Sequence, residues 1–331
     1  MKKLCVLMLA AVMLLVGCAP VQNNAGDKDL VIGIAWRKDV DSEFFTNVCR
    51  AIEQAGGKWV KLEQVTTKEL SFDGSGSLTS GVAETGALDA ETGALIRKNT
   101  WHNSNAEAAV KNVDMVIFTG GEDISPSLYA VQEEWHGIEA EKDYNAERDV
   151  SDFLTMSYCL DKDIPMLGFC RGMQMLAVVS GGETIQDIPT YFSEMGVEYS
   201  YQHRNEKATP ESYRDYAPHT VTVEKNSFLY EIFGTESLEG CPSWHHQAVK
   251  SVDNNHLTVT GYTDTNGIRM IEAVERTDKT FAVGLQFHPE AAVVKNLDNA
   301  ANKGDFMSLD TALSVFKYIL QQKFIEQQNA A

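Results

Sequence analysis

Short apolar runs alternate with segments of helical periodicity through the first half of the chain. The apolar runs are DLVIGIAW (29–36), KWVKL (58–62), VDMVIFTGG (113–121) and DIPMLGF (163–169). Apolar positions recur at helical spacing in SEFFTNVCRAIEQAGG and over 146–161 and 171–180. This alternation predicts an α/β fold with a mostly parallel central sheet and helices on both faces.

The second half of the chain is richer in strand patterns. HTVTVEK, LTVTGYTD, IRMIEAVER and FAVGLQF follow one another with short links, and a helical pattern near 308–323 comes last. No change in composition marks a boundary between two domains. We therefore expect one α/β domain over residues 29–325.

Residues 66–105 do not fit the alternation. The segment is rich in Gly, Ser and Thr, and ETGAL occurs twice, at 84–88 and 91–95. It is interpreted as a surface insertion. It leaves the carboxyl end of the KWVKL run, and ligands bind at this edge of open α/β sheets. The position therefore predicts a lid or a specificity loop.

The N-terminus has the pattern of an export signal. Lys2 and Lys3 precede an apolar run that is short for a membrane span, so residues 1–17 are expected to form a signal peptide. The run ends in LVGC, which resembles a bacterial lipobox. Cys18 is the expected lipidation site, and 18–28 the tether. The alternative is an ordinary signal peptide with a chance cysteine.

Charge limits the partners. The formal net charge of −19 argues against binding to nucleic acid and against electrostatic binding to anionic lipid. Attachment to a membrane is therefore expected through acyl chains alone. The export signal and the lipobox give the expected location, which is the extracytoplasmic side of a bacterial cell-envelope membrane. Four cysteines remain beyond Cys18, and their spacing indicates neither a disulfide framework nor a zinc site. They are Cys49, Cys159, Cys170 and Cys241.

The stretch GFCRGMQML places Cys170 between a predicted strand and a predicted helix. The positive end of a helix dipole stabilises a thiolate. Gly168 and Gly172 permit the tight turn that a nucleophile elbow requires. The N–H groups at the helix start could also bind an oxyanion.

A base follows the last predicted strand. FAVGLQF continues into His288, Pro289 and Glu290. An imidazole can take the proton of a thiol and return it to a leaving amine, and a carboxylate two residues on could orient the ring. The combination with Cys170 is far more specific than either feature alone.

These residues carry a family resemblance. GFCRGMQ with GLQFHPE resembles the class I glutamine amidotransferase family. TGGEDISPSLY, ERD, SGGETIQDI and SWHHQAV resemble its γ-glutamyl-γ-aminobutyrate hydrolase branch, grouped as peptidase C26. The resemblance implies a flavodoxin-like fold and hydrolysis of a γ-glutamyl amide through a thioester. Pro242 departs from the Asn that this branch usually has, which concerns the acceptor pocket rather than the chemistry.

The resemblance also implies residue roles. Cys170 would be the nucleophile, His288 the base and Glu290 its orienting group. The oxyanion hole would be the backbone N–H groups of Gly121 and Arg171.

Other residues concern substrate binding. Gln174 would contact the glutamyl group, with a solvent-facing polar residue as the alternative. His245 and His246 are interpreted as pocket residues. No acidic residue lies at ligand spacing from them, so neither a metal nor another cofactor is expected. Arg148 and Asp149 are interpreted as an internal ion pair.

Two classes of function remain. The first is an extracytoplasmic cysteine hydrolase of a small γ-glutamyl amine or peptide. Export argues against a synthetase partner, which would need cytoplasmic substrates. The second is a lipid-anchored solute-binding protein, which leaves the Cys170 turn unexplained. A family member that has lost its activity is an intermediate case.

Overall fold

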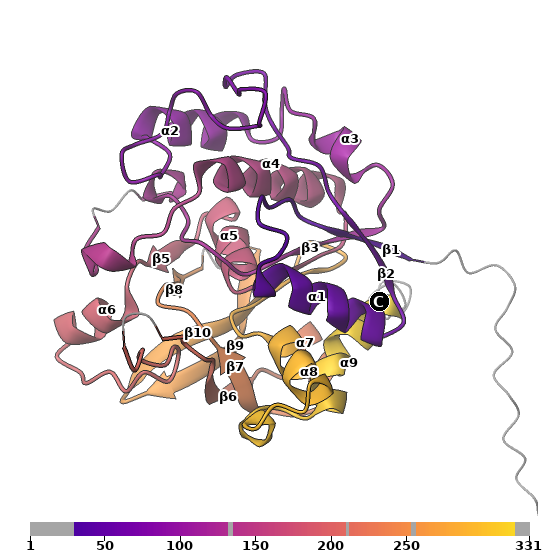
Figure 1. Ribbon diagram of the computed structural model, residues 1–331, viewed down its shortest axis with the longest axis vertical. Helices are drawn as coiled ribbons and strands as arrows, with labels where there is room; N and C mark the ends of the chain where they lie inside the picture. The colour runs from indigo at the N-terminus through magenta and orange to yellow at the C-terminus, as the bar shows by residue number, and fades with distance from the viewer. Residues whose placement is uncertain (1–29, 132–134, 210–211, 253–255, 322–331) are drawn as a thin grey trace, which may run out of the picture.

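A twisted sheet forms the centre of the fold (Figure 1). It has nine strands in the order β2-β1-β3-β4-β11-β10-β9-β6-β7. Its first five strands are parallel, and its remaining pairs are antiparallel. The parallel strands are β2 (Lys58–Lys61), β1 (Val31–Ile34), β3 (Met115–Phe118), β4 (Met166–Phe169) and β11 (Ala282–Leu285). The others are β10 (Ile268–Arg276), β9 (Leu257–Thr265), β6 (Ala217–Val223) and β7 (Ser237–Ser243). The predicted α/β class is confirmed.

This computed structural model describes residues 30–131, 135–209, 212–252 and 256–321. The predicted signal peptide (1–17) and tether (18–28), with Cys18, lie outside the described residues. Within the described part of the chain, no helix has both the length and the apolar character needed to span a membrane.

Helices cover both faces of the sheet. One layer contains α1 (Glu43–Gln54), α7 (Phe228–Phe233), α8 (Pro289–Leu297) and α9 (Leu309–Leu320). The opposite layer contains α2 (Ala90–Asn99), α3 (Ala106–Val110), α4 (Ala146–Lys162) and α5 (Arg171–Val179). Each layer encloses its own apolar core against the sheet, as the period of apolar positions predicts.

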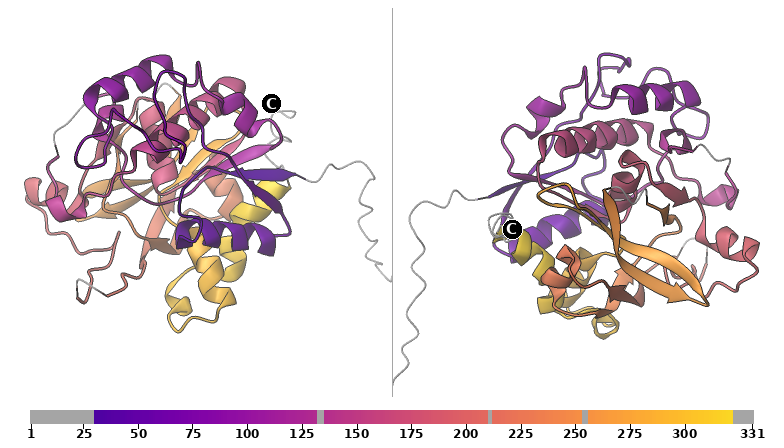
Figure 2. Two further views of the ribbon diagram at one scale, coloured as in Figure 1. Left: turned by 45° about the horizontal axis from the view of Figure 1, so that its top comes forward. Right: turned by 180° about the vertical axis from the view of Figure 1, so that it is seen from behind.

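A smaller unit lies beside the main sheet. Strands β5 (Glu183–Ile185) and β8 (Ala248–Ser251) pair antiparallel, and α6 (Ile188–Glu194) adds apolar side chains to a third core cluster. The view from behind in Figure 2 shows the long β9–β10 hairpin of the antiparallel half.

The interpretation of 66–105 as a purely surface insertion is wrong. Leu88 and Ile96 are 3% and 1% exposed and belong to the core that α4 and α5 enclose. The backbone of Leu88 is also held at both polar groups: its N–H donates to Ser125 Oγ at 2.8 Å, and its carbonyl accepts from Ser127 Oγ at 2.9 Å. Deleting the segment would therefore remove part of the core.

Glu275 is a buried carboxyl in the antiparallel half, and burial raises its pKa from 4.5 to about 7. Because the pKa is higher in the folded than in the unfolded protein, folding favours the protonated form, and stability falls as pH rises between these two values. A glutamine at this position keeps an acceptor for the Phe228 N–H, which lies 2.9 Å from the carboxyl. We expect Glu275→Gln to raise the free energy of unfolding by about 1–2 kcal/mol at pH 8 and to have little effect at pH 5.

Denaturant unfolding at the two pH values measures this difference, and Glu236→Gln at an exposed position is the matched control. An equal effect of Glu275→Gln at both pH values would contradict the titration argument.

Candidate active site

The residues predicted for catalysis and for the oxyanion hole follow the carboxyl ends of three neighbouring parallel strands. Gly121 follows β3, Cys170 follows β4, and His288 follows β11. Strand β4 pairs with both β3 and β11, and Phe169 lies opposite Leu285 in the β4–β11 register. Because parallel strands end at the same edge, residues far apart in sequence meet there.

Cys170 occupies a strained turn between β4 and α5. Its φ and ψ are 50° and −105°, a conformation that side chains other than glycine rarely adopt. Its N–H donates to Leu285 O at 2.7 Å, which ties the turn to β11. A Cβ at Gly172 would lie 2.5 Å from Phe118 O, so α5 can approach the sheet this closely only with glycine there. The predicted tight turn between a strand and a helix is therefore present at Cys170.

His288 and Glu290 form a buried pair. His288 Nδ1 lies 2.7 Å from Glu290 Oε1, and both side chains are fully buried. Burial lowers the pKa of His288, but the charges of Glu290 and Cys170 outweigh it and raise the pKa to about 10.

Gly120 packs against both members of the thiol–imidazole pair. A Cβ at this position would lie 2.7 Å from His288 Cε1 and 3.5 Å from Cys170 Cβ. The rings of Phe44 and Tyr216 also pack on His288, with centroids 5.5 and 5.3 Å away. These contacts hold the imidazole ring in place and limit the access of water to it.

A cavity of about 540 Å³ opens over Cys170. Five of the residues predicted for the site line it: Gly121, Cys170, Gln174, His245 and His246. Among the described residues that line it, none comes from 66–105, so the structure gives no support to the predicted lid.

The three predicted pocket side chains are buried and held by polar contacts. Gln174 Nε2 donates to Gln247 O at 3.0 Å and to Gln286 Oε1 at 3.2 Å, so the solvent-facing alternative for Gln174 is wrong. His245 Nδ1 lies 2.8 Å from Gln247 O. Burial lowers the pKa of His245 well below its usual value.

His246 lies between two carboxylates, with Nε2 at 2.9 Å from Asp123 Oδ1 and Nδ1 at 3.2 Å from Asp187 Oδ1. Burial lowers the pKa of His246, but its bonds to these two aspartates raise it overall. The ring therefore ties the turn after β3 to the start of α6. Both acidic partners are distant from His246 in sequence, so no local spacing predicts them.

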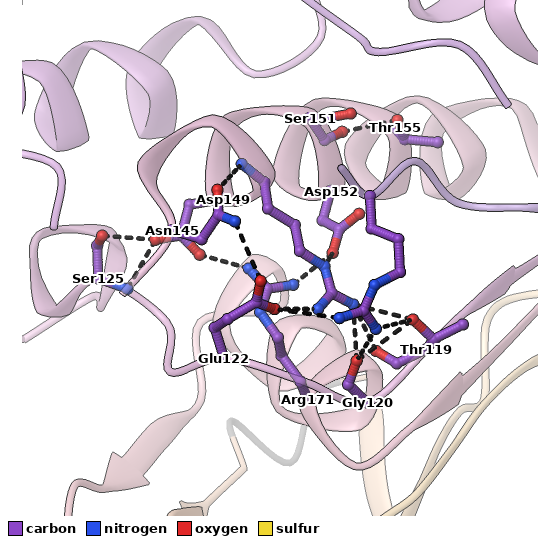
Figure 3. A network of polar contacts seen from close by, with 12 residues as sticks. Thr119, Gly120, Glu122, Ser125, Asn145, Asp149, Ser151, Asp152, Thr155 and Arg171 are labelled. Carbon is purple, nitrogen blue, oxygen red and sulfur yellow. Dashed lines mark hydrogen bonds and ion pairs between the residues drawn. The ribbon is translucent and has the colours of Figure 1, made fainter. Parts of the chain in front are cut away.

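A buried ion network supports the turn after β3. Arg148 Nη2 donates to Gly120 O at 2.9 Å, and Arg37 Nη1 donates to the same oxygen at 3.0 Å. Figure 3 shows Glu122, Asp152 and Arg171 gathered beside this turn. The network fixes the backbone on either side of the predicted oxyanion donors, Gly121 and Arg171.

The interpretation of Arg148 and Asp149 as a pair with each other needs correction. Both are buried in ion pairs, but Arg148 contacts Glu122 and Asp152, while Asp149 contacts Arg171 at 2.5 Å. Adjacent residues on a helix point in different directions, which explains why neighbours in sequence have different partners.

Sequence reasoning missed a group of charged residues at the mouth of the cavity. Arg204 and Arg214 both contact Glu141, at 3.0 and 3.4 Å, and Lys207 lines the same space. They come from the polar loop that precedes β6, which carries no motif. Cations and carboxylates thus lie on the walls of one cavity.

The chain is similar in sequence to a known protein family and to several known proteins. The family model for peptidase C26 matches residues 82–290. The chain is 31% identical over 201 residues to the protein NtpR of Enterococcus hirae, covering 61% of this chain and 75% of that protein. It is 27% identical over 186 residues to the gamma-glutamyl-gamma-aminobutyrate hydrolase PuuD of Escherichia coli K12, covering 56% and 66%. A glutamine amidotransferase of Thermotoga maritima aligns structurally with a TM-score of 0.43 and 14% identity, covering 91% and 98%. The family match spans more than half of the chain and includes Cys170, His288 and Glu290, so this protein belongs to the peptidase C26 family of hydrolases.

Proposed function

We propose that the protein hydrolyses the γ-glutamyl amide bond of a small γ-glutamyl amine or peptide through a thioester on Cys170. The observation that carries the proposal is the meeting of Cys170 with the His288–Glu290 pair at the ends of β4 and β11, beside a cavity. The resemblance to gamma-glutamyl-gamma-aminobutyrate hydrolases supports the choice of bond.

The first half-reaction follows from the positions of these groups. His288 holds the proton of the Cys170 thiol, and the thiolate attacks the amide carbon. The N–H groups of Gly121 and Arg171 are the proposed donors to the resulting oxyanion. His288 then gives its proton to the amine nitrogen, the C–N bond breaks, and a thioester remains.

Water completes the reaction. His288 takes a proton from a water molecule, whose oxygen attacks the thioester carbon. The C–S bond breaks, glutamate leaves, and the proton returns to the Cys170 sulfur. Glu290 keeps the imidazole oriented and stabilises its charge in both halves.

The cavity suits a zwitterionic glutamyl group. The acidic side chains on its wall could bind an α-ammonium group, and the basic ones an α-carboxylate. The acidic side chains are Asp39, Glu122, Asp123, Glu141 and Asp143; the basic ones are Arg37, Arg204, Lys207 and Arg214. A cavity of about 540 Å³ has room for a glutamyl group and a small leaving amine.

Incubation of the full chain with 6-diazo-5-oxonorleucine, a glutamine-mimicking electrophile, tests site and class together. We expect one adduct by intact mass, located on Cys170 by peptide mapping. We also expect release of glutamate from γ-glutamyl substrates but not from α-glutamyl isomers. An adduct without turnover would support a member that has lost activity. Reversible binding without an adduct would support a solute-binding protein.

We further propose that Cys18 is acylated and anchors the enzyme on the extracytoplasmic side of the cell envelope. The LVGC sequence supports this location. Palmitate labelling in a bacterial host should disappear in Cys18→Ala, because the acyl acceptor is lost. Cys5→Ala is the matched control, because that residue lies within the predicted signal peptide and should leave labelling intact. Labelling that persists in Cys18→Ala would contradict the anchor.

A further inference from the structure

We propose that His203, His245 and Glu272 form a binding site for a divalent transition metal of the zinc class, adjacent to the substrate cavity. Each residue offers a donor atom, and these atoms all lie within 4.8 Å of one another. The residues come from three separate segments: the loop before β6, the loop before β8, and β10. The assignment stands independently of the substrate proposed above.

The polar atoms of this cluster are buried without good hydrogen bonds. Glu272 and His203 are fully buried, and His245 is 4% exposed. His203 Nδ1 lies 3.1 Å from Glu272 Oε1, but neither ring nitrogen of His203 and neither oxygen of Glu272 makes a hydrogen bond with acceptable geometry. Native proteins rarely leave so many buried polar atoms unsatisfied in one place. A metal ion would take one donor atom from each of the three residues.

His245 is oriented as a metal ligand would be. Its Nδ1 faces Gln247 O at 2.8 Å, and a carbonyl can only accept, so Nδ1 carries the proton. The other nitrogen, Nε2, then presents a lone pair, and it is buried without a hydrogen-bond partner. A metal-binding histidine usually donates its second nitrogen to a backbone carbonyl in this way.

His219 completes the surroundings from β6. Its Nε2 lies 3.3 Å from Glu272 Oε2, the oxygen opposite to the one near His203. An imidazole in this position can orient a ligating carboxylate. We therefore assign His219 to support Glu272 rather than to bind the metal directly.

The donor set decides the class of ion. Two imidazoles and one carboxylate suit Zn²⁺ and related first-row metals, whereas Mg²⁺ and Ca²⁺ prefer oxygen alone. A tetrahedral zinc ion holds neighbouring donor atoms roughly 3.3 Å apart, so binding would shorten the longest of these separations by up to about 1.5 Å. The fourth ligand would be a water molecule on the side where His245 lines the cavity.

Metal binding at this site would fix the loop before β8, because His245 belongs to that loop. This loop also contains Trp244, whose carbonyl lies 3.9 Å from Cys170 Sγ. A metal bound to His245 would tie the loop to β10 through Glu272. Metal loading is therefore expected to stabilise the wall of the cavity next to the thiol.

Metal titration of the full chain tests the site. A Cys170→Ala background removes the thiol that lines the cavity beside His245 and could compete for the metal. After chelator treatment and desalting, we expect about one Zn²⁺ or Co²⁺ per chain, a Co²⁺ absorption spectrum of tetrahedral type, and a higher Tm with zinc. Glu272→Gln and His245→Ala should each weaken zinc affinity more than about 100-fold, because even supporting residues contribute 10–100-fold. His256→Ala, which removes an exposed histidine, is the matched control and should bind as before.

Zinc affinity that is equal in Glu272→Gln and His256→Ala, or the absence of stoichiometric binding, would overturn the proposal. If Glu272→Gln and His245→Ala do not fold, X-ray absorption of the zinc-loaded Cys170→Ala protein still tests the site. Only nitrogen and oxygen atoms as neighbours of the zinc would support it. Sulfur neighbours would implicate another residue and overturn the assignment. Adduct formation by the diazo reagent on wild-type protein is measured separately, so failure of the metal site and failure of the proposed function are distinguishable.

Discussion

Replacing Cys170 by alanine is expected to lower kcat for a γ-glutamyl substrate by about four orders of magnitude or more, while the fold and substrate binding remain. Loss of a nucleophile in a comparable triad has an effect of this size, because the covalent route is closed. Alanine lacks the sulfur that would form the thioester, and the cavity walls do not depend on that atom. Steady-state kinetics and denaturant unfolding of the same preparation measure both parts of the prediction.

Two of the other described cysteines provide matched controls. Cys49 and Cys159 are buried, and burial raises the pKa of both thiols, that of Cys49 to about 12. Neither lines the cavity, so Cys49→Ala should retain wild-type kcat. Iodoacetamide should modify Cys170 before either of them near neutral pH. Comparable alkylation of all three, or turnover by Cys170→Ala, would contradict the assignment of the nucleophile.

The sequence was most informative where a motif lies at the end of a strand. Cys170 is recognisable because its flanking glycines and the apolar run before it are local features, and His288–Glu290 is recognisable for the same reason. That β4 and β11 are neighbours depends on strand order, which no local pattern encodes. Strand ends that share one edge bring the two motifs together.

Long-range polar partners could not be predicted in the same way. Asp123 and Asp187 contact His246 from positions distant in sequence, and Glu272 approaches His203 from β10. Residue spacing identifies a ligand set only when its members are close enough in sequence to form a recognisable pattern. The core positions of 66–105 were missed for a related reason, since turns rich in glycine and serine separate Leu88 and Ile96 from any long apolar pattern.

The second large effect expected is on stability, at Asp152 in the buried ion network. The network contains three guanidinium groups, from Arg37, Arg148 and Arg171, and each side chain is at most 2% exposed. Asp152 is 1% exposed; it contacts Arg171 Nη1 and lies 3.4 Å from Arg148 Nε. Asp152→Ala would leave an excess positive charge where water cannot solvate it. Removing one partner of a buried ion pair costs about 3–5 kcal/mol of unfolding free energy.

Asp161→Ala on the same helix is the control, because Asp161 is exposed and, among the described residues, its ion pair is with the neighbouring Lys162 at 3.0 Å. Its expected effect is within about 0.5 kcal/mol. Asp152→Asn should be intermediate, since it removes the charge but keeps the shape and one acceptor. Arg148 also donates to Gly120 O, so kcat should fall in Asp152→Ala under conditions where the protein remains folded. Equal stability of Asp152→Ala and Asp161→Ala would show that the arginines do not need this carboxylate. An unchanged kcat in Asp152→Ala would show that the turn carrying Gly121 is positioned without the network.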